Sequence, residues 1–222
     1  MDQQIRKALE KCITAYAEVE QLDVSEVWTG LEGAFVSEQP FLEKVARLDA
    51  VFDDYPRFEE LREIAFDLLL MNFFEADAAR LENDYLESES WEAIEDQTID
   101  RGTELLNLLL YLRECVDEEI EPQLNDYLKE FLLVEEDEFQ DEHRIYEPVI
   151  ANQLLVDSSY QEIAKVAAKM DDDQELAELF YPLMSFFFEQ RPSAADWSAF
   201  NKESASPAFD CAVYGLIVAF NN

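Results

Sequence analysis

The chain has 222 residues, enough for one large domain or at most two small ones. Apolar residues make up 49% of it and aromatic residues 13%, which is more core material than a disordered acidic tail contains. Its 52 acidic and 16 basic residues give a formal charge of −36. This charge excludes binding to nucleic-acid phosphates or to an anionic membrane as the main role, because both would be repelled.

The three cysteines are far apart, odd in number and embedded in apolar helical patterns. This usage is typical of buried reduced thiols and favours a reducing cytoplasm over a disulfide-linked secreted fold. The first residues include an acid and have no basic stretch before an apolar core, so we expect no secretory signal. No apolar run approaches the 18 or more residues of a membrane span. We therefore expect a cytoplasmic protein.

The first twenty residues repeat apolar side chains at three- and four-residue steps, which predicts an amphipathic helix. Asp23 and Glu26 predict a capping box that opens a short helix running through Trp28. We expect Gly30 and Gly33 to end that helix, since glycine is the preferred residue just past a helix C-terminus.

Ser37 is then expected to cap a helix whose apolar face runs over residues 41–52. Pro56 suits the first turn of the next helix, and a long helical pattern follows from 58 to 86. A further apolar helix is predicted over 103–116.

In the second half, Pro122 lies close to a new helix start and Pro148 should kink or split the segment 139–156. Ser159 is predicted to cap a helix, and Ser206–Pro207 to start the last one. No sustained alternation of apolar and polar residues indicates a sheet. The sequence therefore predicts an all-α fold of about nine to eleven helices in a single domain spanning residues 1–222.

Two segments resemble each other. Residues 41–75 and 160–189 each form a predicted helix, a polar turn and a second helix, and each ends in consecutive phenylalanines followed by glutamate. If they are true repeats, the fold is a short solenoid of stacked helical hairpins, and otherwise it is a multi-helix bundle.

Residues for metal or nucleophilic chemistry are sparse. The only histidine is His143, which we expect to be solvated beside Glu147, and the cysteines lack the spacing of a zinc site. Neither a Gly-x-Ser-x-Gly nor a phosphate-binding loop motif occurs. We therefore predict no catalytic residue, no metal site and no cofactor, and expect a protein that is not an enzyme.

One carboxylate pattern supports an alternative. Glu92-x-x-Glu95, followed after 18 residues by Glu114-x-x-Asp117, resembles the signature of all-α nucleotide pyrophosphohydrolases. The resemblance implies two carboxylate pairs on facing helices that hold magnesium against a triphosphate. Substrate phosphates would also need bases nearby, and Arg101 and Arg113 are the two candidates.

Acidic residues are concentrated between Glu114 and Glu142, where 13 acids stand against one base, Lys129. Such density lowers the stability of the folded state by self-repulsion. It has three interpretations: adaptation to an acidic or saline environment, a solvated face without a partner, or a surface complementary to a basic protein. The third favours a toxin-neutralising immunity protein or a nucleic-acid mimic, and a helical scaffold without inhibitory role remains open.

We predict that the partner-binding acids form two clusters. The first is expected near the N-terminus of the helix that Pro122 starts, where the helix dipole favours negative charge. The second is expected near a helix C-terminus, where the dipole disfavours it. The predicted residues are Glu114, Asp117, Glu118 and Glu121 in the first cluster, and Glu135, Glu136, Asp137, Glu138, Asp141 and Glu142 in the second.

Overall fold

The computed structural model describes residues 1–81, 89–135, 138–139, 145–171 and 174–222. These residues form twelve α-helices, two 3-10 helices and one antiparallel pair of very short strands. The predicted all-α fold is confirmed, and the helix count exceeds the expected range by one. The elements are α1 (Gln3–Glu20), α2 (Ser25–Val36), α3 (Phe41–Asp54), η1 (Pro56–Leu61), α4 (Arg62–Leu81), α5 (Glu89–Thr98), α6 (Leu105–Asp117), α7 (Leu124–Leu132), β1 (Leu133–Glu135), β2 (Glu138–Phe139), α8 (Glu147–Ala151), η3 (Gln153–Asp157), α9 (Tyr160–Ala167), α10 (Ala177–Phe188), α11 (Ala194–Glu203) and α12 (Pro207–Phe220).

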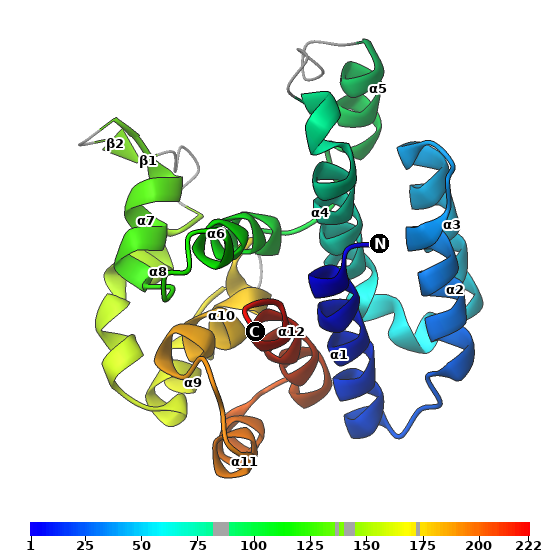
Figure 1. The fold of residues 1–222 in the computed structure, drawn as a ribbon. Coiled ribbons are helices and arrows are strands. Elements are labelled where there is room, and N and C mark those ends of the chain that lie inside the picture. The colour runs from blue at the N-terminus through cyan, green and yellow to red at the C-terminus, as the bar shows by residue number, and fades with distance from the viewer. Residues whose placement is uncertain (82–88, 136–137, 140–144, 172–173) are drawn as a thin grey trace.

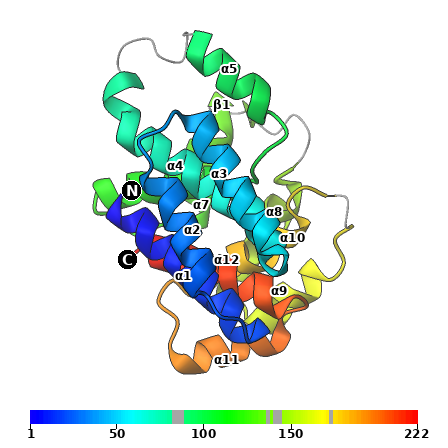
Figure 2. The same cartoon turned by 90° about the vertical axis from the view of Figure 1, so that its right-hand side faces the viewer.

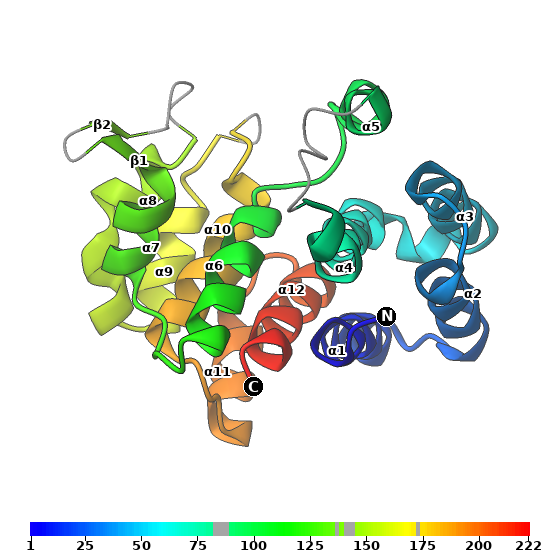
Figure 3. The same ribbon diagram turned by 45° about the horizontal axis from the view of Figure 1, so that its top comes forward.

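The first and last helices form the centre of the bundle. α1 packs along α12, and Figures 1 and 3 show the two side by side between the other helices. A β-carbon added to Gly215 on α12 would lie 3.2 Å from Cγ of Lys11 on α1, so the missing side chain lets the helices approach closely. As predicted, α12 starts with Pro207 at its first turn, and ten of its residues are buried.

α2, α3 and α4 cover one side of this central pair (Figures 1 and 2). The expected end of the second helix at Gly30 and Gly33 is wrong, because α2 continues to Val36. A β-carbon on Gly30 would lie 2.8 Å from Cγ2 of Val51, so this glycine serves close packing of α2 on α3 instead of helix termination. Tertiary packing here outweighs the local preference of glycine for a helix end.

The next two helix starts differ in how well local chemistry predicts them. Ser37 does not cap α3, because its hydroxyl accepts the Gln39 N–H and Pro40 precedes the first helical residue. Pro56 does stand in the first turn of the following helix, which is η1, and α4 continues from it.

α6 to α11 lie on the opposite side of the central pair (Figure 3). Pro148 stands in the first turn of α8 and so separates it from what precedes, as expected. The Ser159 hydroxyl accepts the Glu162 N–H at 3.3 Å and caps α9, which confirms that prediction. His143 lies outside the described residues, so its expected pairing with Glu147, the first residue of α8, stays a prediction.

The two similar segments each form a pair of adjacent helices, α3 with α4 and α9 with α10. They do not stack on each other as in a solenoid, because the α1–α12 pair lies between them (Figure 3). The architecture is a helical bundle.

Buried residues from nearly every helix form one continuous hydrophobic core that runs from Ile5 to Phe220. All three cysteines are buried and outside disulfides. In the part of the chain that the structure describes, no helix combines the length and the apolar character that a bilayer crossing requires.

Candidate functional site

The segment joining α6 to α7 contains the first predicted acidic cluster. α6 ends in a Schellman motif, in which the Ile120 N–H donates to the Cys115 carbonyl at 2.9 Å and the Glu119 N–H donates to that of Val116 at 3.3 Å. Glu119 itself adopts a left-handed conformation with φ 56°. Glycine is the usual residue at this position, since a β-carbon is unfavourable there. We call residues 114–121 the acidic turn.

The structure brings the four acids of the first cluster together on the acidic turn. Glu114, Asp117, Glu118 and Glu121 are all exposed, and Glu119 adds a fifth exposed carboxylate. All four precede α7, which starts at Leu124, as expected, but Glu114 and Asp117 occupy the last turn of α6 instead of lying next to the start of α7. Negative charge at a helix C-terminus is disfavoured by the dipole, so this arrangement does not stabilise α6.

Two apolar side chains are exposed among these acids. Val116 is 40% exposed and Ile120 is 46% exposed. Among the described residues only five large hydrophobic side chains are exposed, and two of these five lie in the acidic turn. The sequence-based prediction did not include this pair, because Val116 was considered only as the last residue of the apolar helix predicted over 103–116. Their four-residue separation within an acidic run was the signal that could have revealed them.

Arg113, the basic residue next to the acidic turn, is paired with neighbouring side chains. Arg113 donates to Oε1 of Gln4 and to Oε2 of Glu75, both at 2.7 Å, and forms an ion pair of 3.4 Å with Asp117. The Arg113 side chain is 25% exposed, whereas that of Asp117 is 64% exposed. The arginine therefore ties α6 to α1 and α4 and leaves the turn strongly negative.

The second predicted cluster is only partly described. Glu135 ends β1 and Glu138 starts β2, and their Cα atoms are partners across the two strands. A helix end does lie nearby, as expected, because α7 ends at Leu132, but these two residues belong to the short strands that follow it. Glu136, Asp137, Asp141 and Glu142 lie outside the described residues.

The carboxylates of the proposed magnesium site belong to separate elements. Glu92 and Glu95 are exposed on α5, whereas Glu114 and Asp117 lie at the far end of α6. Figures 1 and 3 show α5 apart from α6. The described residues contain no group of three acidic, histidine or cysteine side chains that could hold a metal ion. The four carboxylates thus do not form the facing pairs that the resemblance implies.

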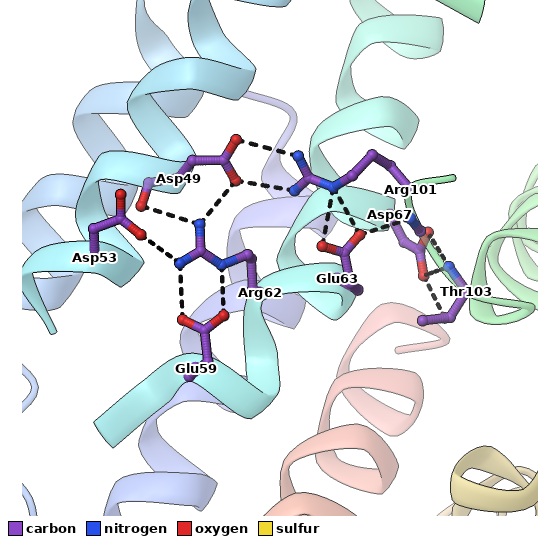
Figure 4. Close-up of polar contacts among 9 residues, drawn as sticks. Asp49, Asp53, Glu59, Arg62, Glu63, Asp67, Arg101 and Thr103 are labelled. Atoms are coloured by element: carbon purple, nitrogen blue, oxygen red, sulfur yellow. Dashed lines mark hydrogen bonds and ion pairs between the residues drawn. The ribbon is translucent and has the colours of Figure 1, made fainter. Parts of the chain in front are cut away.

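A network of arginines and carboxylates, which the sequence did not reveal, joins α3, η1 and α4 to the loop before α6 (Figure 4). Arg62 donates to Asp49, Asp53 and Glu59 at 2.7–3.2 Å, and Arg101 donates to Asp49 and Glu63 at 2.9–3.1 Å. Asp49 is shared by both guanidinium groups. The residues are up to 52 positions apart, so no local spacing predicts the network.

Next to this network, Asp67 holds the start of α6. Its carboxylate accepts the Thr103 N–H at 3.0 Å and the Thr103 hydroxyl, and that hydroxyl accepts the Leu105 N–H at 3.1 Å. Asp67 is fully buried, and this burial raises its pKa to about 8 although the Thr103 bonds lower it. Asp67 is buried and has its hydrogen-bond partners within the fold. We assign it a structural role.

Of the two polar regions, the Arg62–Arg101 network is satisfied within the fold, whereas the acidic turn presents charge and apolar surface outward.

No protein-family model, curated protein or solved structure matches this chain.

Proposed function

We propose that the protein binds a basic protein partner through the acidic turn. The observation that carries the proposal is the exposure of Val116 and Ile120 in the middle of five exposed carboxylates. Protein interfaces combine an apolar centre with a polar or charged rim, and this turn has that composition.

Three features of the turn are unfavourable for the isolated protein. Acids end α6 against the helix dipole, glutamate replaces glycine at a left-handed position, and two large apolar side chains contact water. A solvated face without a partner requires none of them. A partner rich in lysine and arginine would compensate the charge and bury the apolar pair, and its association would be accelerated by electrostatic steering.

Nucleic-acid-binding proteins are a common class of basic partner, because they must neutralise phosphates. A protein that covers such a surface would compete with the nucleic acid and inhibit the partner. We therefore include inhibition of the immunity-protein or nucleic-acid-mimic type in the proposal. The reduced cysteines support a cytoplasmic location for this encounter.

The test compares three variants with the wild-type protein as bait in lysate of the source cells, with quantification of every captured protein. The first variant carries V116S and I120S, and the second carries E114Q, D117N, E118Q and E121Q. The matched control carries E10Q, E18Q, E92Q and E95Q, which removes the same charge from exposed positions elsewhere.

We expect a basic protein to be captured by wild type and control and lost from both turn variants. Its association rate with purified wild type should fall steeply with salt, and the charge variant should flatten that dependence. Capture that all four baits share equally, or a captured partner that is acidic, would refute the proposal.

A further inference from the structure

A pocket of about 370 Å³ opens between α9, α10 and the start of α12. Small-molecule sites commonly begin at about this size. Small and apolar side chains form most of its wall: Ala164, Ala167, Ala168, Met170, Ala177 and Phe209.

Tyr181 closes one side of the pocket in a fixed position. Its hydroxyl donates to the Phe200 carbonyl at 2.8 Å, and its ring stacks on that of Phe200 with centroids 4.7 Å apart. The hydroxyl therefore contributes no free donor, and the ring supplies a flat apolar surface.

The polar groups that line the pocket include three carboxylates, Glu178, Glu203 and Asp210, and no lysine or arginine. Glu203 pairs with the exposed Lys202 at 2.7 Å. Asp210 is only 5% exposed and accepts hydrogen bonds from the Ser204 hydroxyl and the Ser206 backbone, yet no cation in the described part of the chain forms an ion pair with it. Buried carboxylates are normally paired with a cation, so Asp210 provides a site for a positive group from outside.

Burial raises the pKa of Asp210 to about 6, so its carboxylate is mostly ionised at neutral pH. A divalent metal ion does not suit the pocket, because it requires several oxygen ligands around one point. The described residues offer no such group of carboxylates. An organic cation needs only one buried carboxylate for its charge and an apolar wall for its carbon chain.

We propose that this pocket binds a small aliphatic ammonium compound, with its charged head against Asp210 and its alkyl chain on the alanine wall. The site lies on α9, α10 and α12 and does not involve the acidic turn between α6 and α7. It is therefore independent of the proposed partner binding.

The probe is n-butylammonium chloride, titrated into isotopically labelled protein at pH 7.5 and constant ionic strength, with NMR shifts recorded residue by residue. We expect saturable shifts centred on Ala164, Ala168, Ala177 and Asp210. Butanol and butyrate, which lack the positive charge, should give no such shifts at equal concentration. Methylammonium, which lacks the chain, should bind more weakly than the probe.

Two variants separate the pocket from the general attraction of cations to an acidic protein. D210N should weaken butylammonium binding at least tenfold, whereas D157N, which removes an exposed charge, should leave it unchanged. A168L places a larger side chain on an exposed position of the pocket wall, so it should block binding without disturbing the core. Shifts spread over the whole surface, or unaltered by A168L, would overturn the proposal even if D210N folded poorly.

Discussion

The carboxylate of Asp67 occupies the space in which a side chain at residue 102 would begin. A β-carbon added to Gly102 would stand 2.6 Å from Oδ1 of Asp67, and the Gly102 backbone has φ +86°. The Gly102 N–H also donates to Glu63 at 2.7 Å, so the backbone cannot move away without losing that bond. Both the conformation and the space at this position require glycine.

Replacing this glycine should therefore destabilise the protein. We expect Gly102→Ala to lower the free energy of unfolding by about 2 kcal/mol or more, from backbone strain together with the clash on Asp67. Urea denaturation measures the change. Gly33→Ala is the control, because its β-carbon would meet nothing within 4 Å and helix propensity favours alanine by about 1 kcal/mol. Equal effects of the two substitutions would contradict the assignment.

The buried Asp67 carboxyl predicts how stability varies with pH. Its folded pKa of about 8 lies above the ordinary value of 3.8, so between these values the folded state holds a proton that the unfolded state has released. Its contribution to stability is therefore present at low pH and is lost as pH rises through about 8. We expect Asp67→Asn, whose amide oxygen can still accept the Thr103 N–H, to lose less stability than wild type between pH 5 and pH 8.

Denaturant unfolding at several pH values provides this comparison. Asp54→Asn is the matched control, because Asp54 is exposed and its substitution removes the same formal charge. The control should keep the wild-type pH dependence. If Asp67→Asn kept it as well, Asp67 would not be the titrating group.

The left-handed Glu119 allows stability and binding to be separated. Glu119→Gly should stabilise the fold by about 1 kcal/mol, because glycine adopts this conformation without strain. It should also slow association with the basic partner, because it removes one carboxylate of the acidic turn. Gln21 has φ 57° at the end of α1, so Gln21→Gly should give a similar stabilisation with unchanged binding. Thermal unfolding measures the stability of both variants, and association kinetics measure their binding to the partner.

Arg101 should contribute more to stability than an exposed arginine. Its side chain is 21% exposed and satisfies both Asp49 and Glu63, so Arg101→Met leaves two carboxylates without this partner. We expect a loss of about 2 kcal/mol, below the range for a fully buried pair because water still screens the site. Arg57→Met removes a 64% exposed partner of Glu20 and should cost less than about 0.5 kcal/mol. Similar losses in urea denaturation would mean that the network adds nothing beyond surface pairing.

Helix type and several helix starts could be predicted from the sequence because they depend on neighbours within a few residues. The apolar stripe of α1, the Ser159 cap of α9 and Pro207 at the start of α12 each involve contacts inside one or two turns. The high density of acid at 114–121 is equally a property of the sequence, and its exposure follows because an unpaired charge is rarely buried.

Other features depend on residues far apart in the chain. Gly30 lies inside a helix because Val51 packs against it. Asp49 binds both Arg62 and Arg101, and Arg101 lies 52 positions after Asp49 in the chain. The exposure of Val116 and Ile120 depends on where α6 ends and on which faces the other helices leave uncovered. Local propensities amount to tenths of a kcal/mol per residue, whereas burial of one large side chain contributes about 2 kcal/mol. Long-range packing therefore decided where the helices end and which apolar residues remained at the surface.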